Sequence, residues 1–307
     1  MSFTARHLLA GFGLASVLAF SAAAQEVTIT HRQGEVTLPA RPEKVLVLDW
    51  AIVDTLDAMG VAIAGVPGSN APDYLSKYNG DDYLKVGSLF EPDVEAIAAA
   101  DADLLILGGR SAKAYPQVEG LLPTVDLSVD NGAFLDSVTS NITELGEIFG
   151  AQDRAKEMVA ELEAKVAKVR DKAQGKGRAL MLVVSGSKIG VYGADSRTGW
   201  IHNELGFPSV MDAVDDRSDR GDAASYEFIL DRNPDWMFVV DRDAAVGSEA
   251  GTSAKTVLDN ELVRQTNAWK NDHVVYLHPQ EAYVVMNGYQ AVNTLLDQVD
   301  AALTDAQ

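Results

Sequence analysis

A single long helical pattern divides this chain into two parts. Residues 151–174, AQDRAKEMVAELEAKVAKVRDKAQ, place apolar side chains at helical spacing among many charges, contain no Pro or Gly, and are followed by Gly175. This pattern predicts one uninterrupted helix that ends at the glycine. Because strand-like segments lie on both sides of it, we expect the helix to join two folded units.

Strand-like and helix-like segments alternate in both parts. Before the helix come a strand pair with Gly34 in its turn, the strand KVLVLDW, a helix stopped by Gly60, and the strand DLLILGGR. After the helix the pattern restarts with RALMLVVSG and reaches YEFILDRNPDWMFVVDR. Such alternation indicates parallel sheets. We therefore predict an α/β fold of two Rossmann-like lobes, residues 25–150 and 176–307, joined by the helix at 151–175.

The two lobes contain a near-repeat. EAIAAADADLLILGGR (95–110) and EFILDRNPDWMFVVDR (227–242) carry a Glu, an Asp and a final Arg at matching offsets. The Glu and the Asp are common caps, but the residue after an inner parallel strand faces the crevice where such folds bind ligands. Arg110 and Arg242 are therefore predicted to face each other across an interlobe cleft. The alternative is that each arginine pairs with a carboxylate of its own lobe.

The first residues carry an export signal. Arg6 precedes an apolar run from Leu8 to Phe20, and small residues follow up to Ala24. This is typical of a secretory signal peptide spanning residues 1–24. The chain contains no cysteine, so we expect neither disulfides nor a lipid-bearing cysteine at the cleavage site. The expected product is a free monomeric protein of the periplasm, without insertion into the membrane.

The charge balance narrows the class of partner. A net charge of -20 argues against nucleic acid and anionic membranes. An anionic ligand would therefore need a local concentration of positive charge. An exported α/β enzyme is the remote alternative, because the chain has no G-x-S-x-G elbow, no phosphate loop and no H-E-x-x-H motif. We expect a binding protein with no enzymatic activity.

The order and spacing of these segments resemble one family, the periplasmic binding proteins of iron-siderophore ABC importers, and within it the binders of catecholate-type siderophores. The resemblance runs from RPEKVLVLDWAIVDTLDAMGVAIAGVP through ADSRTGWIHNELGF and SYEFILDRNPDWMFVVDRDAAVG to LDNELVRQTNAWKNDHVVYLHP. It implies two α/β lobes bridged by one helix, and a ferric siderophore held between them with modest closure. It also implies no intrinsic cofactor and delivery to an ABC permease and its ATPase.

By motif position the resemblance implies ligand contacts for Arg110 (GGR), Arg197 (DSRTGW) and Arg242 (VDRD). It also implies that Tyr283 contacts the ligand, either binding ferric iron as phenolate or hydrogen-bonding a catecholate oxygen. The alternative is that this aromatic side chain after a strand only packs. Arg220 occupies the position of a histidine ligand in some members, and an arginine cannot bind iron. If Arg220 faces the cleft, it adds a fourth positive charge that suits a six-donor complex. The alternative, which we favour, is pairing with nearby aspartates.

Four further residues are candidates. Tyr192 and Trp50 are expected, on weaker grounds, to line the pocket. Glu95 and Glu227 begin equivalent helices in the two lobes. The resemblance implies that they meet arginines of the permease, whereas the simpler explanation is complementarity to the helix dipole.

Arginines suit a ferric tris-catecholate, which spreads about three negative charges over its rim oxygens. A guanidinium stays charged, offers five N–H donors in a plane and stacks on aromatic rings. One such pair at 4 Å contributes ~1 kcal/mol in water and ~4 kcal/mol in a partly screened cleft. Haem would favour an axial Tyr or His over a ring of arginines. Another chelate such as a corrinoid is also open, and a ferric hydroxamate would need fewer arginines. These ligands remain alternatives on the same scaffold.

Overall fold

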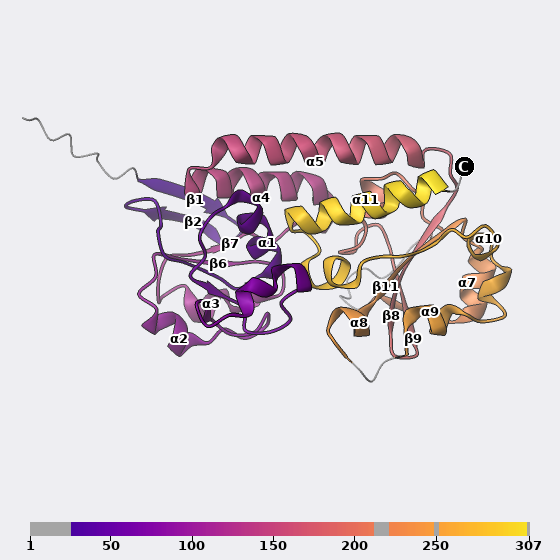
Figure 1. Cartoon of the computed structure of the whole chain (residues 1–307), viewed down its shortest axis with the longest axis horizontal. Helices are drawn as coiled ribbons and strands as arrows, with labels where there is room; N and C mark the ends of the chain where they lie inside the picture. The colour runs from indigo at the N-terminus through magenta and orange to yellow at the C-terminus, as the bar shows by residue number, and fades with distance from the viewer. Residues whose placement is uncertain (1–25, 212–220, 249–251, 306–307) are drawn as a thin grey trace, which may run out of the picture.

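Two five-stranded sheets, one in each lobe, form the frame of the molecule (Figure 1). The computed structural model describes residues 26–211, 221–248 and 252–305. The expected signal peptide and Arg220 lie outside these ranges. The predicted α/β class with two lobes and one connecting helix is confirmed. Within the described ranges, no helix is long and apolar enough to cross a membrane.

The first lobe is built on an all-parallel sheet of strand order β5-β4-β3-β6-β7. The central strands are fully buried and consist of Val and Leu/Ile runs, as expected for a sheet covered on both faces. An antiparallel pair, β1 and β2, stands beside this sheet. The strands are β1 (Val27–His31), β2 (Gly34–Leu38), β3 (Val45–Val47), β4 (Gly65–Val66), β5 (Leu84–Lys85), β6 (Leu104–Leu107) and β7 (Thr124–Asp126). The α-helices are α1 (Trp50–Met59), α2 (Val94–Ala99), α3 (Tyr115–Val118) and α4 (Phe134–Phe149).

The second lobe has the strand order β10-β9-β8-β11-β12. Only β8, β11 and β12 are parallel, whereas β9 and β10 run antiparallel. The expectation of purely parallel pairing was wrong here, because the turn at Gly186 (φ 57°) returns the chain directly as a hairpin. The strands are β8 (Ala179–Ser185), β9 (Lys188–Tyr192), β10 (Asp222–Ala224), β11 (Trp236–Asp241) and β12 (Val274–Tyr276). The helices are α6 (Trp200–Asn203), α7 (Tyr226–Arg232), α8 (Arg242–Ala245), α9 (Ala254–Leu258), α10 (Asn267–Lys270) and α11 (Tyr289–Asp305).

The near-repeat corresponds to equivalent positions in the two sheets. Asp103 precedes β6 and accepts the backbone N–H of Lys44, at the start of β3, at 2.7 Å. Asp235 precedes β11 and accepts the N–H of Arg178, at the start of β8, at 2.9 Å. Each aspartate therefore fastens two adjacent central strands together. The strand order reverses between β3 and β6 in the first sheet and between β8 and β11 in the second. Open α/β sheets bind ligands at such a topological switch point.

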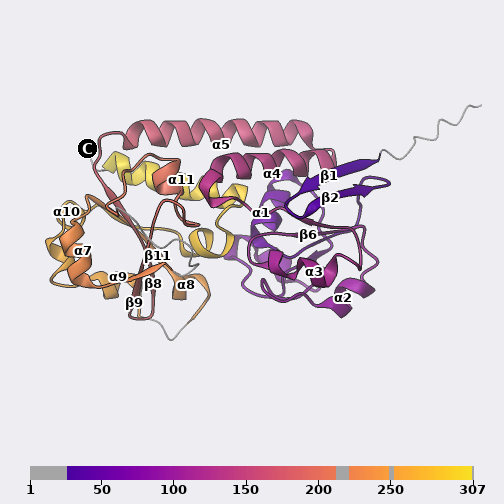
Figure 2. The same cartoon turned by 180° about the vertical axis from the view of Figure 1, so that it is seen from behind.

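Helix α5 (Gln152–Ala173) lies along both lobes, as Figures 1 and 2 show. Its bounds agree with the predicted helix to within one residue, and Gly175 follows with φ 72°. A buried stripe that includes Met158, Leu162 and Val166 packs into the core of the second lobe. Ion pairs such as Lys165–Asp297, at 2.9 Å, also join it to α11. Exposed pairs contribute little, so the apolar stripe provides most of the attachment.

The chain returns to the first lobe through a second connection. The π-helical turn η5 (Glu281–Val285) leads from the second lobe into α11, and Val284 and Val285 are buried in the core of the first lobe. The last segment therefore belongs to both lobes in its packing. This places η5 at the junction between them.

Asp54 of α1 fixes the beginning of α11. Its Oδ1 accepts the N–H of Gln290 at 2.7 Å, and its Oδ2 accepts the N–H of Ala291 at 3.1 Å and the hydroxyl of Tyr74 at 2.6 Å. A Cβ at Gly288 would lie only 2.6 Å from the Asp54 carboxyl carbon, so only glycine permits this approach. A buried side chain of the first lobe thus caps a helix of the last segment.

This contact predicts a specific pH dependence of stability. Burial raises the pKa of Asp54 from 3.8 to about 7, against the opposing effect of its hydrogen bonds. Because the pKa is higher in the folded state, the associated stability is fully present below pH 4 and is lost as the pH rises through 7. We expect the destabilisation caused by Asp54→Asn to shrink by on the order of 4 kcal/mol between pH 4 and pH 8.

Urea unfolding of both proteins across this pH range measures the effect. Asp297→Asn, at a carboxylate that is 67% exposed, is the control. A difference between wild type and Asp54→Asn that does not change with pH would contradict the prediction.

Candidate ligand-binding site

A cavity of about 870 Å³ lies between the lobes, at the carboxyl ends of the central strands. Its volume is within the range of small-molecule sites. Both lobes and the η5 segment contribute to its wall. The lining residues used below are Asp49, Phe90, Gly109, Arg110, Lys113, Ser128, Ser185, Lys188, Tyr192, Arg197, Arg242, Tyr283 and Met286.

Three guanidinium groups surround the ring of Tyr283. The Cζ atoms of Arg110, Arg197 and Arg242 lie 5.4, 4.5 and 5.8 Å from the ring centroid. The Nε–H of Arg242 also donates to the Tyr283 hydroxyl at 3.2 Å. Arg110 comes from the first lobe and the other two arginines from the second, so the structure brings these four residues together at the interlobe cavity. Their contact with a ligand remains a prediction.

Arg242 follows β11 and begins α8. One of its terminal nitrogens lies 3.2 Å from a carboxylate oxygen of Asp243 and 3.4 Å from the Ser185 hydroxyl. Asp241 instead caps α8, accepting the N–H of Ala244. Arg242 thus pairs with a carboxylate of its own lobe, as the alternative interpretation expected, and that carboxylate belongs to Asp243 rather than Asp241. The Arg242 side chain is still 41% exposed, so it retains surface toward the cavity.

Arg110 has a role that the sequence did not indicate. It donates to the backbone carbonyl of Tyr283 at 2.6 Å and to that of Val284 at 3.2 Å. A side chain of the first lobe thus fastens η5. Met286 follows with φ 59° and ψ -65°, inside a turn closed by the hydrogen bond from the N–H of Asn287 to the carbonyl of Val285. This is a strained γ-turn, of a kind that clusters at functional sites.

Arg197 projects from the loop between β9 and α6. Its Cζ lies 5.8 Å from the ring centroid of Tyr192, so the guanidinium is close to two tyrosine rings of the cavity wall. Its Nε is buried and has no hydrogen-bond partner among the residues that the structure describes. Tyr192 lines the cavity as expected and is only 3% exposed.

The phenol of Tyr283 is more acidic than usual. Partial burial alone would raise its pKa, but hydrogen bonds and charge from Arg197 and Arg242 lower the pKa below the ordinary value of 10.0. Behind Arg110, burial raises the pKa of Asp49, although the N–H of Ala51 and the charge of Arg110 act in the opposite direction. The arginines therefore stabilise the phenolate form of Tyr283, whereas burial destabilises the charged form of Asp49.

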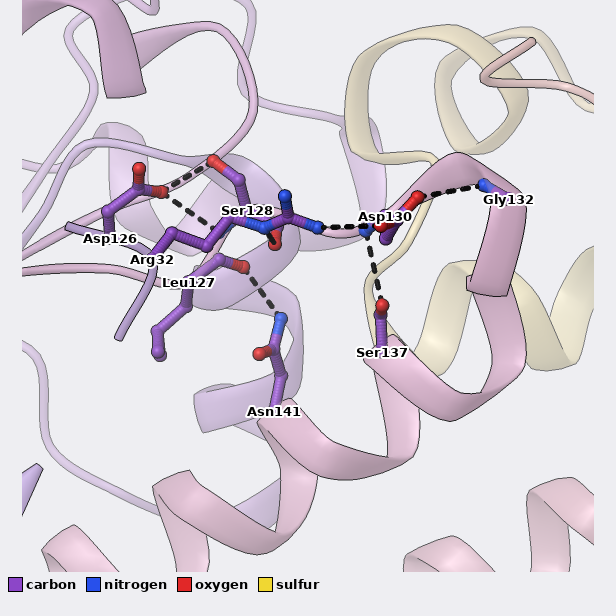
Figure 3. A network of polar contacts seen from close by, with 8 residues as sticks. All are labelled: Arg32, Asp126, Leu127, Ser128, Asp130, Gly132, Ser137 and Asn141. Carbon is purple, nitrogen blue, oxygen red and sulfur yellow. Dashed lines mark hydrogen bonds and ion pairs between the residues drawn. The ribbon is translucent and has the colours of Figure 1, made fainter. Parts of the chain in front are cut away.

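A hydrogen-bond network holds the wall on the side of the first lobe (Figure 3). The buried Asp126 accepts from the backbone and hydroxyl of Ser128, and the Ser128 hydroxyl accepts the N–H of Gly109 at 3.0 Å. Arg32 donates to the Ser128 carbonyl, and Asn141 donates to the Leu127 carbonyl. The turn that carries Arg110 is thereby tied to the loop after β7.

Trp50 was wrongly expected to line the pocket. It is 1% exposed, belongs to the core of the first lobe and donates its indole N–H to the carbonyl of Ser69. The reason is that α1 begins at Trp50, which turns this side chain into the core, while Asp49 before it lines the cavity. Arg220 lies outside the described residues.

Sequence reasoning also missed other wall residues, among them two lysines and a phenylalanine. Lys113 shortly follows Arg110, Lys188 begins β9, and Phe90 lies in the loop between β5 and α2. The position of Lys113, shortly after the end of β6, could have indicated that it lines the cavity. Glu95 and Glu227 are exposed in the first turns of α2 and α7 and do not line this cavity. Within the described ranges, no group of three or more His, Asp or Glu is arranged to hold a metal ion.

The acidity of Tyr283 gives a spectroscopic prediction. The chain contains 9 tyrosines, and one of them should ionise below pH 10 in an ultraviolet difference titration. Tyr283→Phe should remove this component, and Arg197→Ala should move it to higher pH because a stabilising charge is lost. An unchanged titration curve in Tyr283→Phe would show that Tyr283 is not acidified.

Comparisons with known proteins agree with this architecture. The petrobactin-binding protein YclQ of Bacillus subtilis is 34% identical over 284 residues, covering 91% of this chain and 89% of the relative. The ferric-anguibactin-binding protein FatB of Vibrio anguillarum is 31% identical, covering 89% and 86%. The crystal structure of the catecholate-siderophore binding protein VctP from Vibrio cholerae matches with a TM-score of 0.85 and 31% identity, covering 90% of this chain and all of that chain. Residues 45–281 match the periplasmic binding protein family. With two α/β lobes, one bridging helix and an interlobe cavity, the chain belongs to the periplasmic binding protein family.

Proposed function

We propose that this protein captures a ferric siderophore, of the catecholate type, in the interlobe cavity and delivers it to an ABC permease for iron uptake. The observation that carries the proposal is the convergence of Arg110, Arg197 and Arg242 on the Tyr283 ring. The names of its relatives support the same ligand class, since they bind petrobactin and ferric anguibactin and the structural neighbour binds catecholate siderophores. In this proposal iron is cargo, and the protein is a periplasmic, monomeric carrier without catalytic activity or cofactor.

The local charge explains how an acidic protein binds an anion. The chain carries a net charge of -20, yet among the described residues five cationic side chains line the cavity: Arg110, Lys113, Lys188, Arg197 and Arg242. At a separation of about 5 Å and an effective dielectric constant of about 20, each unit charge pair contributes roughly 3 kcal/mol. Repulsion from distant carboxylates is screened beyond about 10 Å. The nearby cations therefore dominate the energy of an anion in the cavity.

Tyr283 is proposed to contact the bound complex. Its lowered pKa favours a phenolate able to bind ferric iron when the chelator leaves a position open. When the chelator supplies all six donors, the protonated phenol can instead donate to a catecholate oxygen. Tyr192 forms part of the wall beside Arg197. For Arg220 we retain the proposal that it pairs with its neighbouring aspartates.

The same geometry weighs against the other ligands. Haem or a corrinoid needs an axial ligand more than a ring of guanidiniums. Here Tyr283 would have to be that axial ligand, but three arginines surround its ring. A ferric hydroxamate carries less negative charge and gains less from the cations.

Titration of the mature protein with ferric tris-catecholate, ferric hydroxamate and haemin tests the ligand class. Tryptophan fluorescence supplies the signal. We expect the catecholate complex to bind most tightly, and each of Arg110→Ala, Arg197→Ala and Arg242→Ala to weaken it by about 1.5–3 kcal/mol, as for hydrogen bonds to charged groups.

Arg264→Ala is the matched control, because Arg264 is 52% exposed, pairs with Asp259 and does not line the cavity. Tight binding of haemin or hydroxamate that is indifferent to the three cavity arginines would contradict the proposal.

Delivery is proposed to use Glu95 and Glu227. Each is exposed in the first turn of its helix, one on each lobe, and hydrogen bonds from its own backbone N–H and from Ser225 lower the pKa of Glu227. Both therefore present anionic groups to a pseudo-symmetric partner with positive charges. Contact with permease arginines is our proposal for that partner.

Charge reversal separates docking from ligand binding. Glu95→Lys and Glu227→Lys should each abolish most iron uptake while leaving ligand affinity within about twofold, because neither residue lines the cavity. Glu163→Lys, on the exposed side of α5, is the control. Uptake that persists in the double variant would refute the docking role.

A further inference from the structure

Phe90 is an exposed aromatic side chain in the cavity wall. It is 64% exposed, the most of any large apolar side chain in the described residues. Of the other aromatic rings of the wall, Phe134 at 5% and Tyr192 at 3% are buried, and Tyr283 is partly buried beneath the arginines. Single exposed apolar side chains are common on protein surfaces. Phe90 differs from a case such as Leu121, which is 42% exposed, because Leu121 does not line the cavity.

The loop that carries Phe90 is tightly organised. Gly87 has φ 119°, and a Cβ there would lie 2.4 Å from the carbonyl oxygen of Glu91. The hydroxyl of Ser88 accepts the N–H groups of Phe90 and Glu91 at 3.2 and 3.0 Å, and the N–H of Ser88 donates to the carbonyl of Glu91 at 2.8 Å. Leu89 anchors the loop in the core at 4% exposure. Backbone hydrogen bonds and packing therefore hold Phe90 at the cavity.

The charge of the guanidinium cluster does not distinguish an aryl chelate from an aliphatic one of equal charge. Arginines and lysines respond chiefly to negative charge and oxygen acceptors. An aromatic ring at the wall adds a different preference, because it packs on flat apolar faces in offset or edge-to-face geometry and removes its own exposed area from water. Phe90 has that area available.

We propose that Phe90 is a specificity-determining residue that packs against an aryl ring of the chelator held in the cavity. The proposal rests on the proposed function and adds to it the side chain that recognises the aryl group. The charged oxygens of the ligand then face the arginine cluster, while the outer part of one ring contacts Phe90. Selection for aryl chelates thus comes from a residue outside the cation cluster.

Two ferric complexes of equal charge test this proposal. A tripodal tris-catecholate and tris-oxalate both bind iron through six oxygens and carry three negative charges, but only the first has aryl rings. We expect wild type to prefer the tris-catecholate, and Phe90→Ala to reduce this preference about tenfold by weakening tris-catecholate binding alone. Phe90→Trp should restore the preference, and Leu121→Ala should leave it unchanged.

The dependence on salt separates the roles of Phe90 and Lys113. Phe90→Ala should lower affinity by the same factor at every salt concentration, whereas Lys113→Ala should reduce the slope of affinity against salt. Two outcomes would overturn the role of Phe90 and leave the proposed function intact, provided that wild type binds the tris-catecholate. In the first, Phe90→Ala keeps the wild-type preference. In the second, Phe90→Ala loses the same affinity for both complexes. Failure of wild type to bind the tris-catecholate at all would overturn the proposed function itself.

Discussion

The cavity depends on the convergence of three guanidinium groups around one tyrosine ring. Like charges at this spacing repel each other, so each arginine needs its own compensation. Arg242 has Asp243, Arg110 has the carbonyls of the η5 turn, and Arg197 lies near the rings of Tyr192 and Tyr283. These contacts fix the arginines without neutralising most of their charge. The result is a concentrated positive region inside a strongly acidic protein.

The same residues connect ligand binding to the way the lobes are joined. Arg110 of the first lobe holds the backbone of the segment that carries Tyr283, and Asp54 holds the start of α11 just beyond it. Helix α5 spans the lobes on one side, and this second connection joins them next to the cavity. Two connections that pack into both lobes restrict large hinge motion. The two connections favour a largely preformed cavity, and modest closure on binding stays a prediction.

The sequence was most informative where local pattern and packing agree. At residues 151–174 the apolar stripe, the charged positions and the following Gly175 all predict the same helix, and the structure contains it at Gln152–Ala173. The repeated Asp and Arg of the two lobes were also readable. The Asp before each inner strand binds the backbone of the neighbouring strand, and the Arg after it lies at the carboxyl end of the sheet, beside the cavity. The antiparallel strands β9 and β10 were missed, since a short hairpin turn overrides the expectation of a crossover.

Other parts of the site depend on contacts between distant segments. Trp50 follows a strand just as the arginines do, but the start of α1 directs it into the core. The contact of Arg110 with the η5 carbonyls, across 173 positions of the chain, has no local sequence signal. Phe90 is an apolar residue in a polar loop, and only the fold shows that this loop reaches the cavity.

We infer that the positive charge concentrated at the Tyr283 arginine cluster selects the ligand. The most direct measurement compares one tripodal tris-catecholate loaded with gallium(III), which carries three negative charges, and with germanium(IV), which carries two. The two complexes have nearly the same size and shape and the same aryl rings. We expect at least about tenfold tighter binding of the gallium complex, since one unit charge is worth more than ~1.4 kcal/mol beside several guanidiniums. Equal affinities for the two complexes would contradict it.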